Sequence, residues 1–234
     1  MKIKKKNFSE WNNKNAFRRK FGTKLPKSYP DETLVRILNS RSYSKLTSNI
    51  INKKNAKVCD IGCMSGNNLR FFIDKGFKPY GVDVNKAMLE IGKKNLKRMK
   101  YKIPNLKIGN NLNIPFKNSF FDLLISFGTI HYNYGNNVLK SLMEFRRVVK
   151  KSGIVIIETT GNKHDLKKNA IRKGNLEWIC KVKGFRKNKI FGWFDSKSHF
   201  KKSLKKIFKE VEILENINST QKTVIHSIMA ICKV

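Results

Sequence analysis

Apolar residues from Lys57 onward follow two alternating patterns along the chain. Short apolar runs bounded by turn residues indicate strands, and apolar residues spaced three and four positions apart indicate amphipathic helices. The expected strands are 57–62, 79–84, 106–109, 121–126, 154–158, 211–214 and 227–232. This alternation is typical of an α/β fold with a parallel sheet.

The expected helices lie between these strands. They are 67–75, 87–99, one that carries Val138, Leu142, Phe145 and Val149, and one marked by Leu204, Ile207 and Phe208. Gly76 is expected to end the first of them. The third is expected to end at 150–153, where two cations and a serine precede Gly153.

Two segments depart from the alternation and define the domain organisation. Residues 1–55 are predicted to be a helical or irregular N-terminal leader or cap, in which Asp31 can cap a helix. Residues 56–234 then form the main domain. Within it, 159–195 are predicted to be an insertion or lid that carries Trp178, Trp193 and Phe194.

The formal net charge of +35 in 234 residues has two possible explanations. One is a nucleic-acid or anionic partner. The other is compositional bias, which we favour because Lys and Asn are spread along the whole chain and Arg supplies only 10 of the 51 basic residues. The charge alone therefore does not predict an RNA-binding protein.

The four cysteines form no Cys-x-x-Cys pair, so neither a zinc site nor a small disulfide scaffold is predicted. The chain starts with Met1-Lys2-Ile3-Lys4-Lys5-Lys6 and no apolar stretch follows, so we expect neither a secretory signal nor a membrane span. These features predict a cytoplasmic protein with reduced thiols.

The first candidate site is the turn that follows the first strand, Asp60-Ile61-Gly62-Cys63-Met64-Ser65-Gly66. Its glycines permit positive φ and a close approach of a ligand to the main chain. The spacing is not the G-x-G-x-x-G of a dinucleotide site. Asp60 directs an acid toward the turn, which suits a cationic, amino-bearing ligand better than a pyrophosphate.

Polar residues also follow the next strands. Asp83 ends the second strand, where a carboxylate can accept both ribose hydroxyls of an adenosine. The segment 109–116 follows the third strand, where Asn110 and an adjacent backbone N–H can contact the adenine edge. The fourth strand leads through 118–126 into 127–132.

These motifs, in this order, resemble the class I S-adenosylmethionine-dependent methyltransferases, specifically the small-molecule methyltransferase type 11 subgroup. That family has Asp-x-Gly-Cys-Gly-x-Gly, an acid after strand two, Gly-Asp-Ala-x-x-Leu-Pro-Phe, Ser-Phe-Asp-Leu-Val and Arg-Val-Leu-Lys-Pro-Gly-Gly. The corresponding residues here are 60–66, Asp83, 109–116, 119–124 and 147–153. The resemblance covers about 55–160, with a looser similarity at 194–211.

The resemblance implies a Rossmann-like, seven-stranded, mostly parallel sheet with helices on both faces and an antiparallel last strand. It implies S-adenosyl-L-methionine as the methyl donor and no metal. The cofactor-binding residues it implies are Asp60, Gly62, Cys63, Met64, Gly66, Asp83, Val84, Met88, Asn110, Asn111, Leu112, Ser126 and Phe127.

The chain departs from the family pattern at three places. Met64 stands where the family prefers Gly, so the backbone there is less free. Asn110 replaces the usual Asp and can still accept from the adenine amino group through its carbonyl oxygen, but without charge. Lys151-Ser152 replaces Pro-Gly in a surface turn. The first two changes raise the question of a weakened cofactor site.

Methyl transfer of this kind depends on positioning, and a base is needed only if the acceptor must lose a proton. His131 lies just past the fourth strand and is a candidate base, or else a packing histidine. Tyr132 and Trp193 are candidates for an acceptor pocket or for the core. Trp11, Tyr29 and Arg36 are candidates for a leader that closes over the cofactor, or for plain packing and surface.

Three functions remain open at this point. The first is methylation of a small molecule, with a sugar or surface-polysaccharide precursor suggested by a loose resemblance of the leader and 191–196 to methyltransferases of bacterial surface-polysaccharide clusters. The second is an RNA methyltransferase, although no separate RNA-binding module is evident. The third is a non-catalytic basic binding protein on a methyltransferase fold. His164, His199 and His226 show no metal-ligand spacing.

Overall fold

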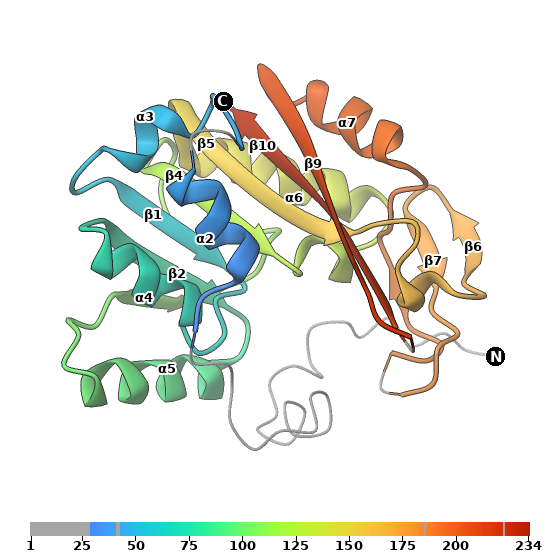
Figure 1. Cartoon of the computed structure of the whole chain (residues 1–234), viewed down its shortest axis with the longest axis horizontal. Helices are drawn as coiled ribbons and strands as arrows, with labels where there is room; N and C mark the ends of the chain where they lie inside the picture. The colour runs from blue at the N-terminus through green and yellow to red at the C-terminus, as the bar shows by residue number, and fades with distance from the viewer. Residues whose placement is uncertain (1–28, 41–42, 185, 222) are drawn as a thin grey trace.

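The computed structural model describes residues 29–40, 43–184, 186–221 and 223–234, which form a sheet with helices on both faces (Figure 1). The strands of the main sheet are β1 Lys57–Ile61, β2 Lys78–Asp83, β3 Asn105–Ile108, β4 Phe121–Phe127, β5 Val149–Thr160, β9 Glu210–Ser219 and β10 Val224–Lys233. Their order across the sheet is β3-β2-β1-β4-β5-β10-β9.

The first five strands of this sheet run parallel, and β10 is antiparallel to both of its neighbours, β5 and β9. The order reverses between β1 and β4, so the carboxyl ends of these two strands flank a topological switch point, where ligands bind in open α/β sheets. The predicted Rossmann-like, seven-stranded sheet with an antiparallel last strand is confirmed.

Six helices among the described residues cover the sheet: α2 Glu32–Asn39, α3 Ser48–Ile51, α4 Asn67–Asp74, α5 Lys86–Arg98, α6 Asn136–Val148 and α7 Lys197–Lys205. Side chains alternate between the faces of a strand. In β4, Leu123 packs with the apolar residues of α2, α3 and α4, whereas Leu124 packs with those of α6 and α7. All seven residues of β4 except the last are buried, as expected for a central strand.

The ends of two helices follow directly from their sequence. Asp31 caps α2, because its Oδ1 accepts the N–H groups of Thr33 and Leu34 at 3.0 and 3.3 Å. At the end of α4, Gly76 has φ +76° and the N–H of Phe77 donates to the Phe72 carbonyl at 2.9 Å. This is the Schellman arrangement that a glycine one residue past the cap permits.

The end of α6 differs from the expectation. The helix ends at Val148, and Val149 already pairs with Phe121 in the sheet, so the expected helical end at 150–153 is wrong. Ser152 has φ +65°, and the β4–β5 register shifts between Phe121 and Leu123. The apolar side chain of Val149 is buried either way, so the apolar spacing did not distinguish helix from strand.

The last helix is also shorter than expected, because α7 ends at Lys205 and both Ile207 and Phe208 follow it. Between β5 and α7 lies the segment that breaks the alternation. It contains a short 3-10 turn, η3 Asp165–Lys167, and a second, antiparallel sheet of β6 Ile171–Gly174, β7 Glu177–Ile179 and β8 Ile190–Phe191. This small sheet lies beside the carboxyl half of β5 in Figure 1.

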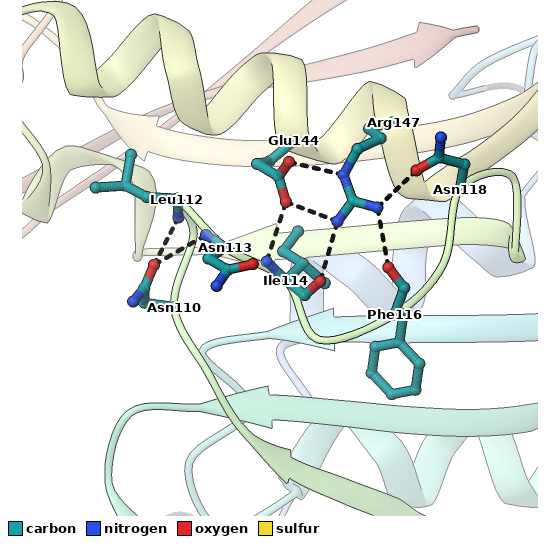
Figure 2. Close-up of polar contacts among 8 residues, drawn as sticks. All are labelled: Asn110, Leu112, Asn113, Ile114, Phe116, Asn118, Glu144 and Arg147. Atoms are coloured by element: carbon teal, nitrogen blue, oxygen red, sulfur yellow. Dashed lines mark hydrogen bonds and ion pairs between the residues drawn. The ribbon is translucent and has the colours of Figure 1, made fainter.

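The connection between β3 and β4, residues 109–120, contains no helix. Side chains of α6 hold this loop in place (Figure 2). Glu144 accepts the N–H of Ile114 through Oε2 at 3.0 Å. Arg147 donates to the carbonyl oxygens of Ile114 and Phe116 at 3.0 and 2.9 Å and to Asn118 Oδ1 at 2.8 Å. The two side chains also pair with each other at 2.7 and 2.8 Å. The loop conformation therefore depends on one ion pair.

We expect Arg147→Met to lower the free energy of unfolding by about 1–3 kcal/mol, because it leaves two carbonyl oxygens and the Glu144 carboxylate without their donor. Arg146→Met is the matched control, since Arg146 is the exposed neighbour in the same helical turn. Urea unfolding of both variants measures the difference. Equal loss in the two variants would show that the ion pair does not hold the loop.

Candidate functional site

The turn after β1 lies against the end of β2. The N–H of Gly62 donates to the Val82 carbonyl at 2.7 Å, and Gly62 has φ +77°. A Cβ at Gly62 would lie 2.0 Å from Thr129 Cγ2, so the segment after β4 packs directly on this glycine. Gly66 has φ +78° and is the N-cap residue of α4. Both glycines are therefore required by the backbone, as the pattern predicted.

Asp60 is an acid buried inside this turn, with 2% of its surface exposed. Burial raises the pKa of its carboxyl to about 7, a hydrogen bond from the Asn68 side chain opposes this rise, and the charge of Asp83 adds to it. Its Oδ2 is buried and has no hydrogen-bond partner in the structure. A buried carboxyl oxygen without a donor is rare and marks a place where a donor from a ligand fits.

Asp83 lies at the end of β2, one strand away from Asp60. Its Oδ2 accepts the N–H of Met64 and its Oδ1 accepts the N–H of Asn85, both at 2.8 Å. Asn85 in turn caps α5 by accepting the N–H of Met88 at 3.2 Å. One carboxylate thus ties the first turn to the start of α5, which places Val84 and the buried Met88 beside it.

Met64 has φ +48°, in the left-handed region that costs a non-glycine residue about 1–2 kcal/mol. This explains the glycine that the family pattern prefers at the position. The hydrogen bond from the Met64 N–H to Asp83 holds the turn in this conformation. The neighbouring Cys63 is buried and packs with Leu69 and Leu89, so its side chain faces the protein rather than the crevice.

Asn110 uses its side chain within its own loop (Figure 2). Its Oδ1 accepts the N–H groups of Leu112 and Asn113 at 2.8 and 3.1 Å. A carbonyl oxygen has two acceptor positions, so accepting a further donor from an adenine would require one of these bonds to open. Asn111 is buried and Leu112 is half-buried. Contact between these three residues and a cofactor stays a prediction.

Ser126 and Phe127 end β4 next to the first turn. Ser126 is fully buried, and its Oγ lies 2.6 Å from Thr129 Oγ1. Phe127 is half-buried and packs against the apolar cluster under α2. Ser126 therefore contacts Thr129, which packs on Gly62.

His131 lies in the 3-10 turn η2 Ile130–Tyr132 and is 6% exposed. Its Nδ1 is 3.5 Å from Thr160 Oγ1, and its carbonyl accepts the N–H of Gly192 at 3.0 Å. These contacts tie the end of β4 to the segment that contains the small sheet. They support the packing role, and a role as base stays a prediction.

The aromatic candidates near His131 differ in accessibility. Trp193 is fully buried and stacks on Phe191 with ring centroids 5.0 Å apart, so it belongs to the core of the 159–195 segment. Tyr132 is half-buried and its hydroxyl accepts from Arg186 Nη2 at 3.2 Å. Burial raises the pKa of Tyr132, and the charge of Arg186 opposes this.

Three residues at this edge were missed by sequence reasoning. Asn68 lowers the pKa of the Asp60 carboxyl, Thr129 packs on Gly62, and Glu158 faces Gly128, where its Oε2 is 3.7 Å from the position of a Cβ. Glu158 also accepts from the Ser227 hydroxyl. The sequence signal at Asn68 is a polar residue in the first turn of a helix. The signal at Glu158 is an acid at the end of an apolar strand.

The remaining candidates lie apart from this edge. Tyr29 is 64% exposed, Arg36 pairs with Glu32 at 2.6 Å, and Trp11 lies outside the described residues. A groove of about 660 Å³ lined by Tyr80, Phe116 and Phe120 contains none of the predicted site residues. Within the described ranges, no group of His, Cys, Asp and Glu has the geometry of a metal site, and no helix could span a membrane.

Comparison with known proteins identifies the family. A family model described as a methyltransferase domain matches residues 52–228. A Methanocaldococcus jannaschii protein of unassigned function is 32% identical over 197 residues, which cover 81% of this chain and 70% of that protein. The demethylmenaquinone methyltransferase of Bacillus velezensis is 32% identical over 145 residues, and the match covers 58% of this chain and 60% of that enzyme.

The fold is shared with solved structures. A SAM-dependent methyltransferase from Methanosarcina mazei superposes with a TM-score of 0.64 at 18% identity, covering 80% of this chain and 96% of that one. The family match spans most of the chain, and the strand order agrees with the expected class. The chain therefore belongs to the methyltransferase domain family and has the class I, S-adenosylmethionine-dependent fold.

Proposed function

We propose that this protein transfers a methyl group from S-adenosylmethionine to a small-molecule acceptor. The observation that carries the proposal is the buried Asp60 Oδ2, which has no partner and lies at the switch point of the sheet. The α-amino group of the cofactor is a cation with hydrogen-bond donors, which is the group that such an oxygen lacks.

The residues at this edge fit the cofactor in three respects. Asp60 provides an acceptor for the ammonium group, Asp83 provides a carboxylate at the end of the neighbouring strand for the ribose, and the positive-φ turn 62–66 lets a ligand approach the main chain. The cofactor supplies an activated methyl group on a sulfonium. The residues of this chain supply orientation and exclusion of water, which is catalysis by positioning.

The acceptor side lies between η2 and the segment 159–195. We propose that this segment is a lid, because Gly192 is bonded to His131 and Arg186 to Tyr132 across the two segments. A sugar or surface-polysaccharide precursor carries hydroxyl groups, and His131 is the proposed base that removes their proton. The reducing cytoplasm suits the four buried, unpaired cysteines.

RNA is the alternative acceptor, and the distribution of charge is the observation that bears on it. Exposed lysines lie on α5, at Lys94 and Lys97, and on α7, at Lys201 and Lys205. These helices occupy opposite sides of the molecule (Figure 1). Charge dispersed in this way favours compositional bias over a single nucleic-acid surface.

A methyl-transfer assay on fractionated cell extract tests the proposal directly. We expect radiolabel from S-adenosylmethionine to appear in the small-molecule fraction and not in RNA. Label in RNA would favour the alternative acceptor. Binding is tested separately, since S-adenosylhomocysteine at about 100 times its Kd should stabilise the fold by about 2.7 kcal/mol. Absence of both label and stabilisation would leave a non-catalytic protein on this fold.

Asp83→Ala should weaken binding of S-adenosylhomocysteine by about 1–3 kcal/mol, because the ribose hydroxyls and the Met64 N–H lose their acceptor. Asp74→Ala removes an exposed acid from α4 and serves as the control. Isothermal titration calorimetry measures both. An affinity of Asp83→Ala equal to that of the control would refute the ribose assignment.

Affinity for S-adenosylhomocysteine should rise with pH through about 7, because the ligand ammonium pairs with ionised Asp60 whereas the pKa of the free carboxyl is about 7. The expected gain is about tenfold between pH 6 and pH 8. The stability of the unliganded protein changes with pH in the opposite direction. Its raised carboxyl pKa contributes stability below pH 4 that is lost as pH rises toward 7. Asp60→Asn should remove both dependences, and calorimetry and urea unfolding across this range check them.

A further inference from the structure

Glu158 is an acid near the carboxyl end of β5, a strand that is apolar at its centre. The four residues before it, 154–157, are all buried, and Glu158 itself is half-buried. Removing part of a carboxylate from water costs free energy unless hydrogen bonds compensate for it. Packing alone would favour a further apolar residue here, so the acid indicates a role in binding.

The register of the sheet places Glu158 on the same face as Asp60, the acid of the proposed cofactor site. Asp60 pairs with Ile125 of β4, and Ile125 pairs with Ile156 of β5. Glu158 lies two residues beyond Ile156, and residues two apart in a strand share a face. Two strand spacings across the sheet and two residues along it separate the Cα atoms of Asp60 and Glu158 by about 12 Å. The two acids therefore face different parts of a ligand that lies along this edge.

Both oxygens of the Glu158 carboxylate are oriented by their surroundings. Oε1 accepts a hydrogen bond from the hydroxyl of Ser227 in β10. Oε2 lies 3.7 Å from the position of a Cβ at Gly128, the residue that follows β4 and has φ +63°. Among the described residues, no other atom lies within 4 Å of that position once the chain neighbours of Gly128 are left aside. The last strand thus holds the carboxylate, and the glycine leaves room in front of Oε2 at the end of β4.

The end of β5 also carries a contact to the proposed base. Thr160 lies two residues after Glu158 on the same face, and its Oγ1 is 3.5 Å from His131 Nδ1. Residues two apart in a strand are separated by about 7 Å, which a small acceptor molecule spans. The acid and the proposed base therefore flank one place at the end of β5, on the acceptor side of the proposed site.

We propose that Glu158 is a specificity-determining residue that accepts a hydrogen bond from a hydroxyl or amine group of the methyl acceptor. This inference rests on the proposed function and narrows its acceptor. An ionised carboxylate only accepts hydrogen bonds and repels other anions. Glu158 therefore selects molecules that present an O–H or N–H group at the end of β5 and rejects those that present a carboxylate there. Ser227 acts through Glu158 and is a positioning residue.

The first test is Glu158→Gln, which keeps the size of the side chain and an oxygen for the Ser227 hydroxyl but removes the charge. Methyl transfer from radiolabelled S-adenosylmethionine is measured in the small-molecule fraction of cell extract, diluted in series so that relative kcat and KM follow without naming the acceptor. We expect kcat/KM to fall about ten- to hundredfold, mainly through KM. Affinity for S-adenosylhomocysteine, measured by calorimetry, should stay within about twofold of the wild type, because Glu158 does not face the cofactor's ammonium group.

Glu212→Gln is the matched control. Glu212 is a half-buried acid of β9 on the same face, since it pairs with Ile231, whose partner in β5 is Ile156. We expect wild-type kinetics from this variant. Wild-type KM in Glu158→Gln, or a parallel loss of S-adenosylhomocysteine affinity, would refute the role of Glu158. Absence of label with the wild-type protein would instead refute the proposed function, so the two failures are distinguished by the wild type alone.

The second test concerns Ser227. Ser227→Ala leaves Oε1 without the hydroxyl that orients it, and we expect KM for the same fraction to rise about threefold with kcat retained. Ser227→Thr restores a hydroxyl at the same position and should restore KM. Equal KM values in the alanine and threonine variants would show that the hydroxyl does not position the carboxylate.

The third test identifies the chemical class of the labelled product. A methylated amine remains a cation and is retained on a cation-exchange column, whereas a methylated hydroxyl is an uncharged ether and passes through. Either result agrees with a donor group that faces Glu158. Label that mild base releases as methanol marks the methyl ester of a carboxylate acceptor. That product would overturn the proposal, because Glu158 would repel such an acceptor.

Discussion

The arrangement at the carboxyl edge of the sheet depends on keeping a carboxyl group buried without a cationic partner from the described residues. Burial favours the protonated form of Asp60, and Asp83 one strand away adds repulsion. The fold tolerates this because the surrounding hydrogen bonds are nearly complete. Backbone N–H groups satisfy Asp83, and the Asn68 side chain partly opposes the rise in the pKa of Asp60. Asp60 Oδ2 has no donor among the described residues, and in the proposed function the ammonium group of the cofactor provides one.

This edge is supported from both faces of the sheet by different means. On one face, α2 is tied to the first turn of α4, because the Asp31 N–H donates to Asn68 Oδ1 at 3.0 Å. On the other, α6 holds the 109–120 loop through the Glu144–Arg147 pair, which bonds the backbone on both sides of Pro115. An ion pair suits the loop, because it is half-exposed and tolerates charge.

The sequence predicted β1, β2, β3 and β4 to within one residue at each end, whereas β5, β9 and β10 extend further than expected. It predicted the end of α6 poorly, since Val149 is buried in a helix or a strand alike. The glycine pattern located the first turn, and the positive φ of Met64 explains the one departure within it. The hydrogen bond between Asp31 and Asn68 could not be predicted, because the two residues are 37 positions apart and no local pattern encodes that contact.

The proposed acceptor side was the least predictable part for a related physical reason. In the proposed function its residues come from η2 and from 159–195, segments that lack the periodicity of helices or long strands. There the side chains of His131, Tyr132 and Phe191 pack on one another, and backbone bonds such as Gly192 to His131 replace regular pairing. A cofactor site built on strand ends is constrained by the sheet, whereas an acceptor site built on such segments is free to vary with its substrate. Family membership therefore identifies the donor of the methyl group, whereas the acceptor remains a matter of the proposed function.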